Sequence, residues 1–130
     1  MKGIDMLKTQ MILVILFSIL SIIIISCDNE DQQRSGGPYY FESFVNYKIP
    51  FQPIKELASD EAKSRNSYYV AYYDNDGRII SFTKYLGGKI EFDDKYIYDG
   101  QGRLVRRELT KSTGETIIQH FNKRGKLIVK

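Results

Sequence analysis

The chain contains a single cysteine, Cys27, among its 130 residues. No disulfide can form within the chain, so burial of side chains must stabilise its fold. All ten tyrosines and six of the seven phenylalanines follow Cys27. Each aromatic ring can bury a large area, and tyrosine keeps a polar tip for a hydrogen bond. We therefore expect aromatic rings to supply much of the buried surface.

The sequence also lacks an apolar run of the usual transmembrane length. The longest uncharged stretch near the N-terminus, Met11–Ile25, has fifteen residues, whereas a bilayer-spanning helix needs about twenty. Two lysines precede the stretch, and a small residue, Ser26, follows it. This order is typical of an export signal, so residues 1–26 are predicted to be a cleaved signal peptide. An uncleaved N-terminal membrane helix is the alternative.

The residues at the predicted cleavage point, Ile24-Ile25-Ser26-Cys27, resemble the lipobox of bacterial lipoproteins. In that family the cysteine thiol receives a diacylglycerol before cleavage, which implies that Cys27 is the lipidation site, with palmitate among the acyl groups. Several acyl chains together give stable anchoring, since each buried methylene contributes about 0.8 kcal/mol. The resemblance implies a lipid-anchored protein of the cell envelope, and it leaves the membrane and leaflet open.

After Cys27 the composition becomes polar, from Asp28-Asn29-Glu30-Asp31 to Ser35-Gly36-Gly37-Pro38. Such a segment is typical of a flexible linker, so residues 27–38 are predicted to be a tether. The remaining residues, 39–130, are enough for one small domain with one core and too few for two.

The chain has little excess charge. Its formal net charge is +3, of which residues 1–26 carry one unit, so the mature chain carries +2. This balance predicts no nucleic-acid partner. The charge is unevenly spread, because residues 28–99 hold 9 basic and 13 acidic side chains while residues 100–130 hold 8 and 2. The basic C-terminal part indicates either contact with an anionic surface, such as lipid headgroups or acidic glycans, or a set of solvated charged strands.

One pattern recurs three times, at intervals of about 25 residues. It consists of an aromatic residue, Asp or Asn, two free positions, Gly, a basic residue and then aliphatic residues. Asp or Asn can open a type I turn, and Gly in the left-handed conformation can close the hairpin with a bulge. We therefore predict positive φ at Gly77 and Gly102. The three copies are residues 71–80, 96–105 and 119–128.

Turn signals also lie between the copies, at Leu86-Gly87-Gly88-Lys89 and at Lys111–Glu115. Consecutive strands joined by short turns run antiparallel. The sequence therefore predicts a mainly β fold, an antiparallel meander of repeated hairpins with repeats near 68–130. Strands are expected near 68–73, 78–86, 90–98, 103–110, 115–121 and 126–129.

Upstream of the repeats, Tyr39–Tyr47 is rich in aromatic residues and can add a strand, whereas Pro50 and Pro53 are expected to break the chain after Tyr47. The run Ser59-Asp60-Glu61-Ala62-Lys63 indicates a helix start with Ser59 as N-cap. One short helix is predicted between Ile54 and Arg65, packed on the sheet.

The repeats, above all Tyr96-Ile97-Tyr98-Asp99-Gly100-Gln101-Gly102-Arg103-Leu104, resemble the YD repeat of Rhs and teneurin-type proteins. The resemblance covers roughly residues 68–130. In those proteins many repeats form a β shell around a polypeptide, which three repeats cannot close. The resemblance therefore implies the fold and a surface role. It also suggests an accessory or immunity-like protein that masks a partner toxin.

Few residues are suited to catalysis or metal binding. His120 is the only histidine, and acylation of Cys27 removes the only thiol, which excludes Cys-His and Ser-His-Asp sites and the usual zinc ligand sets. We expect His120 to be a partly buried strand residue. Neither a metal nor a cofactor is predicted.

Carboxylates offer two further possibilities. Strand alternation places Glu91 and Asp93 on one face and Asp94 on the other, so a paired-acid site is conceivable, although a solvated charged face explains the same residues. The run Asp74-Asn75-Asp76-Gly77 resembles part of a calcium loop. Aligning Gly77 with the sixth loop position leaves two ligand positions without oxygen ligands of the required kind, so a turn explains this run better.

Three functions remain open. The leading hypothesis is a membrane-tethered binding module without catalysis, whose protein or glycan partner contacts a tyrosine-bearing sheet face with Tyr72, Tyr96 and Tyr98. The second is a carboxylate-based hydrolase of envelope polymers that uses Glu91 and Asp93. The third is the accessory or immunity-like protein suggested by the YD repeats.

Overall fold

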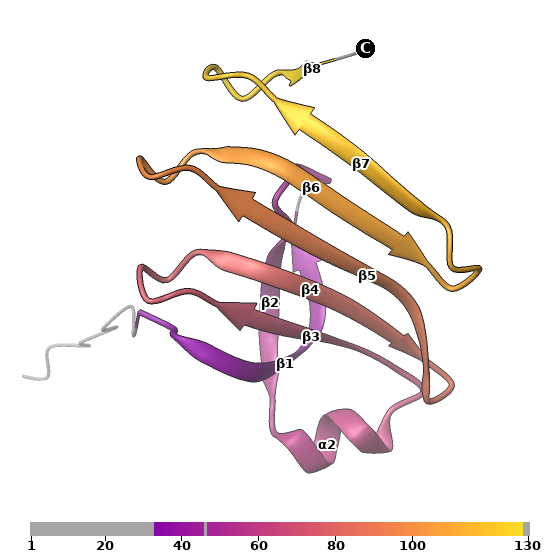
Figure 1. The fold of residues 1–130 in the computed structure, drawn as a ribbon. Helices are drawn as coiled ribbons and strands as arrows, with labels where there is room; N and C mark the ends of the chain where they lie inside the picture. The colour runs from indigo at the N-terminus through magenta and orange to yellow at the C-terminus, as the bar shows by residue number, and fades with distance from the viewer. Residues whose placement is uncertain (1–32, 46, 129–130) are drawn as a thin grey trace, which may run out of the picture. The chain divides into compact units, whose positions relative to one another are not determined.

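The computed structural model describes residues 33–45 and 47–128. They form an eight-stranded antiparallel sheet with one short helix, in the strand order β2-β1-β3-β4-β5-β6-β7-β8 (Figure 1). Among these residues no helix is long and apolar enough to cross a bilayer. The mainly β meander predicted from the sequence is confirmed.

The repeat region supplies the six strands that follow one another in the sheet. Their bounds agree with the predicted ranges to within one or two residues, although Val129 lies outside the described residues. The strands are β3 (Ser67–Tyr73), β4 (Ile79–Leu86), β5 (Lys89–Tyr98), β6 (Leu104–Lys111), β7 (Thr116–Phe121) and β8 (Leu127–Ile128).

The repeat turns have the geometry that their sequence predicts. Gly77 and Gly102 both have a φ of +76°, in the left-handed region that favours glycine. In the second turn Asp99 N–H donates to Arg103 O at 2.9 Å, and Gly102 N–H donates to Asp99 O at 2.9 Å. The same two backbone hydrogen bonds occur in the first and third turns. The predicted repeat register is therefore correct.

Two strands precede the repeats. β1 (Gly36–Val45) begins three residues before the predicted start of the domain and pairs with β3. β2 (Gln52–Leu57) pairs with β1 at the outer edge of the sheet. Pro53 lies within β2, so the prediction that it breaks the chain was wrong. An edge strand tolerates proline because one side of its backbone needs no partner.

The second half of β1 and β2 cross behind the sheet (Figure 1), and we call this hairpin the arm. Its Phe44 and Phe51 rings lie 5.7 and 5.5 Å from the Phe82 ring of β4. Phe82 is fully buried, as are Phe41 of β1 and Ala71 of β3. The arm thus forms a second layer, and the aromatic core lies between it and the sheet.

The single described helix, α2 (Ser59–Ser64), lies within the predicted range and packs against β1 and β3 through the buried Ala62. The predicted N-cap was wrong by one position. Ser59 is already the first helical residue, so Ala58 is the N-cap, and its methyl side chain cannot make a capping hydrogen bond.

Candidate binding surface

The sheet has two different faces. We call the face under the arm the inner face and the opposite one the outer face. The pairing between neighbouring strands places one residue from each of five strands in a row across the outer face. This row runs from Tyr72 through Ser81, Lys95 and Glu108 to Ile118. Tyr72 is 40% exposed and Ile118 is 50% exposed. Neither α2 nor the arm covers this row within the described residues, so aromatic, aliphatic and charged side chains are all accessible there.

Four tyrosines gather at the β1–β3–β4 side of the outer face, and we call Tyr40, Tyr68, Tyr72 and Tyr85 the tyrosine cluster. The rings of Tyr68 and Tyr85 stack at 5.0 Å with an interplanar angle of 4°. The Tyr40 ring lies 6.2 Å from Tyr68, and the Lys63 ammonium of α2 lies 5.8 Å from the Tyr40 ring centre. Three strands and the helix therefore position one aromatic surface.

Tyr85 is partly buried among the other cluster tyrosines. Burial and the neighbouring Tyr68 and Tyr72 hydroxyls raise the pKa of Tyr85. A glycine helps to place Tyr72. A Cβ on Gly37 would lie only 2.8 Å from Tyr72 Cδ1, so only a glycine lets this ring approach the β1 backbone so closely. The close approach of Tyr72 to β1 thus fixes its ring at the edge of the cluster.

Of the three tyrosines predicted to share a contact surface, only Tyr72 lies on the outer face. Tyr96 is 3% exposed, and its hydroxyl donates to Asp94 Oδ2 at 2.8 Å. The half-buried Tyr98 donates to Ile79 O at 2.7 Å, and burial raises its pKa to about 12. Tyr96 belongs to the core and Tyr98 packs against it, because alternation along β5 puts both on the inner face with Asp94.

The core also holds an ion pair that sequence reasoning missed. Arg107 Nε lies 2.7 Å from Asp94 Oδ1, and the two side chains are 10% and 0% exposed. Burial lowers the pKa of Arg107, but the hydrogen bonds and charge of Asp94 outweigh it, so this pKa stands above its ordinary value. Arg107 also donates to Gln119 Oε1 at 3.0 Å. The pair crosslinks β5, β6 and β7, which is a structural role.

The two carboxylates predicted to form a paired-acid site are separated. The register shifts in β5 beside Lys84 and Tyr85, and this bulge turns Glu91 to the inner face, where it pairs with Lys84 Nζ at 2.6 Å. Asp93 stays on the outer face and accepts from Thr83 Oγ1 at 2.7 Å. The prediction that they share a face was wrong, because strict alternation fails at a bulge.

Two other predicted residues have clear positions. The Asp74 carboxylate accepts hydrogen bonds from Asp76 N, Arg78 N and Arg78 Nε, at 2.7 to 3.0 Å. Its oxygens hold the turn together, as the turn interpretation of this run requires. His120 lies in β7 but is exposed on the outer face, so its predicted partial burial was wrong. In the part of the chain that the structure describes, no second layer covers this end of the sheet.

Cys27 and the predicted signal peptide lie outside the described residues. Part of the predicted tether is ordered, since Gln33 Nε2 donates to Asn75 O at 3.4 Å and Ser35 Oγ to Asn75 Oδ1 at 3.2 Å. Residues 33–35 of the predicted tether thus lie against the first repeat turn.

Residues 33–130 match the model of the Family of unknown function (DUF6156). Because this match covers well over half of the chain, the protein belongs to that family. Comparisons with curated proteins and with solved structures give no match.

Proposed function

We propose that this member of the DUF6156 family is a lipid-anchored binding module of the bacterial cell envelope, which holds a protein or glycan partner without catalysis. The anchor is Cys27, and the contact surface is the tyrosine cluster with the neighbouring outer face. The observation that carries the proposal is the grouping of four tyrosines on an uncovered sheet face.

Tyrosine suits such a surface because its ring offers contact area at a small entropic cost, while its hydroxyl adapts to polar partners. Ile90 pairs with Tyr85 and adds an apolar side chain beside the cluster, where it is 48% exposed. Exposed apolar surface next to aromatic rings is typical of an interaction site. The hydrolase hypothesis loses its basis, because Glu91 and Asp93 lie on opposite faces.

The test uses the tagged full chain in its own cells. Metabolic labelling with an alkyne-tagged palmitate should label the chain, and Cys27→Ser should abolish the label and leave the chain unprocessed or released. Ser26→Ala is the matched control, because it keeps a small residue before the cysteine and should keep the label. Persistent labelling of Cys27→Ser would remove the anchor from the proposal.

The same cells supply the test of the contact surface. Crosslinked partners are captured with Tyr72→Ser, and Tyr47→Ser serves as control because Tyr47 is 91% exposed and lies outside the cluster. Capture should fall about tenfold or more with Tyr72→Ser, as expected for a central aromatic contact, and stay near wild type with Tyr47→Ser. Both variants should keep the wild-type melting temperature. Equal capture by the two variants would contradict the proposed surface, and the captured partner itself decides the immunity-like alternative.

A further inference from the structure

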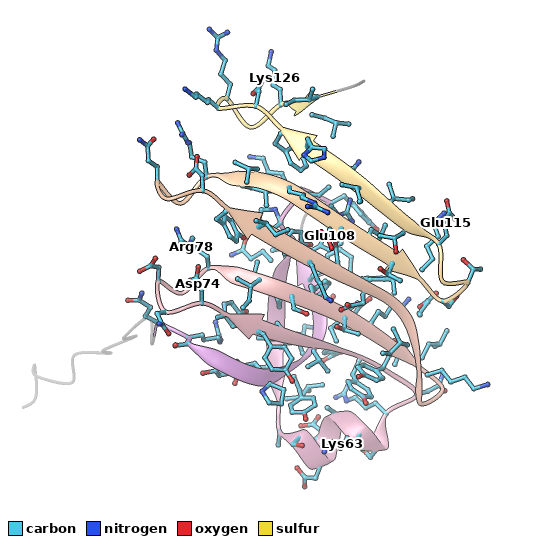
Figure 2. All side chains as sticks on the ribbon, in the orientation of Figure 1. Lys63, Asp74, Arg78, Glu108, Glu115 and Lys126 are labelled. Carbon is cyan, nitrogen blue, oxygen red and sulfur yellow. The ribbon has the colours of Figure 1, made fainter. Side chains whose placement is uncertain are left out.

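All three repeat turns lie at one end of the sheet. In a meander every second connection falls at the same end, so the β3–β4, β5–β6 and β7–β8 turns share one side, and the connections between them share the other (Figure 1). We call the former the turn end. Figure 2 shows Asp74, Arg78 and Lys126 there and Glu115 at the opposite end.

The chain also enters the domain at the turn end. Gly36 of β1 pairs with Tyr73, the last residue of β3, and Gln33 contacts the first turn through Asn75. Only residues 28–32 separate Gln33 from Cys27, and a chain of this length spans at most roughly 20 Å. An anchor on Cys27 therefore keeps the turn end within about that distance of the bilayer surface.

The three turns differ in charge. In the first, Arg78 Nε pairs with Asp74 Oδ2 at 2.7 Å, and in the second, Arg103 pairs with Asp99 at 2.7 Å. In the third, Asn122 replaces the aspartate, and its side-chain Oδ1 accepts from the backbone N–H groups of Arg124 and Lys126. The first two turns thus neutralise their arginine internally, and the third has no carboxylate to do so.

The third turn consequently carries a free cationic group, which we call the basic turn and which consists of Lys123, Arg124 and Lys126. All three side chains are exposed, and none forms an ion pair with any residue in 33–45 or 47–128. At the opposite end, by contrast, Lys111 pairs with Glu115 at 2.8 Å.

We infer that the basic turn docks on the anionic phospholipid headgroups of the membrane that holds the anchor, so that the turn end faces the bilayer. This inference rests on the proposed lipid anchor. Each basic side chain near an anionic surface raises occupancy about fivefold at moderate ionic strength, and the anchor supplies a high effective concentration. The strands then run away from the membrane, and the outer face stays open to a partner.

The experiment places the purified, lipidated full chain in vesicles of phosphatidylcholine, either alone or with phosphatidylglycerol. An environment-sensitive dye is attached at Gly100→Cys, where a Cβ meets nothing within 4 Å, or at Thr113→Cys at the opposite end. Spin-labelled headgroups quench the dye at short range. We expect quenching at position 100 to rise at least twofold in anionic vesicles and to return to the neutral-vesicle value in 0.5 M salt, with no change at position 113.

A charge-matched pair of variants identifies the group responsible. The triple variant Lys123→Gln, Arg124→Gln, Lys126→Gln should lose the anionic-vesicle increase, while Lys48→Gln, Lys89→Gln, Lys95→Gln should keep it. Equal quenching in neutral and anionic vesicles, or equal loss in both triple variants, would overturn the inference. Intact mass, measured first, separates the two proposals. A chain without an acyl group refutes the anchor and with it this docking, whereas an acylated chain with unchanged quenching refutes only the docking.

Discussion

Glycine is needed at one place in each repeat turn and tolerated at another. Gly102 has a φ of +76°, and a Cβ there would lie 2.6 Å from the Arg78 Nη1 atom. Gly100, two residues earlier, has neither a positive φ nor a neighbour within 4 Å of an added Cβ. The two glycines of one turn thus differ only in the features that a side chain would disturb.

Gly102→Ala should therefore destabilise the domain by about 1–2 kcal/mol, the cost of left-handed backbone for a residue with a Cβ. Gly100→Ala should change the free energy of unfolding by less than about 0.5 kcal/mol. Chemical denaturation of both variants and the wild type measures the difference. Equal free energies for the two variants would show that the left-handed conformation carries no cost in this turn.

The buried ion pair shows what one residue can require of its neighbours. Asp94 has no exposed surface, so its charge must be compensated inside the core, where Arg107 and the Tyr96 hydroxyl provide three donors. Removing one partner of such a pair typically costs more than replacing both, because it leaves a buried charge alone. A charged residue on β5 therefore requires particular partners on the neighbouring strands. Asp94 and Arg107, taken separately, are residue types typical of an exposed strand.

Among the structural elements, the repeat turn is held together by the side chain of its first residue. Asp99 Oδ1 accepts from Gln101 N and Arg103 N, each at 2.9 Å, and Oδ2 accepts from Arg103 Nε at 2.8 Å. The hydrogen bonds from Arg103 lower the pKa of Asp99. Asn122 shows that an amide can replace the carboxylate and still hold the backbone of the turn.

Because the pKa of Asp99 is lower in the folded state than in the unfolded chain, its contribution to stability is complete above the unfolded value of about 3.9. That contribution is lost as the pH falls below this value and through the lowered one. Asp99→Asn should keep the turn and weaken the acid-induced loss of stability below pH 4, as measured by unfolding midpoints from pH 2 to 7. An identical pH profile for wild type and variant would mean that the unfolded chain already holds this carboxylate at the same pKa.

The sequence predicted those elements whose causes are local. The turn at Gly77 follows from the residues within it, and the strand ranges of the meander follow from the spacing of such turns. The arm could not be predicted, because its position depends on Phe44 and Phe51 contacting rings of distant strands. The Glu91 and Asp93 prediction failed at a bulge, which breaks the two-residue period without a sequence signal.

The sequence predicted the type of candidate site but only one of the residues that form it. A tyrosine-bearing sheet face exists, but of the predicted residues only Tyr72 belongs to it. Tyr85 faces it because the β3–β4 register pairs it with Tyr68, and Tyr40 faces it because β1 joins β3. The pairing between strands decides which tyrosines lie together. The spacing of tyrosines along a single strand does not predict that pairing.

Across the whole molecule the packing is uneven. The arm covers the inner face of β3 to β5, where Ala71 and Phe82 have no exposed surface. Among residues 33–45 and 47–128, no element packs over β7 and β8 as a second layer, and Ile118 and Leu127 are 50% and 46% exposed. In a repeat array each unit is stabilised by its neighbours, so an end unit with one neighbour and no covering layer is held least firmly.

Amides in β7 should therefore exchange with solvent deuterium through local opening, at least tenfold faster than equivalent hydrogen-bonded amides in β3. The β3 amides should exchange only on global unfolding. Native-state hydrogen exchange followed by NMR measures both sets. Phe51→Ala tests the cause, because Phe51 contacts rings of β4 and β5 and, within the described residues, none of β7. The variant should therefore speed exchange in β4 and β5 far more than in β7. Uniform exchange across all strands would show that the sheet opens as one unit, and that the arm stabilises β7 as strongly as the strands it covers.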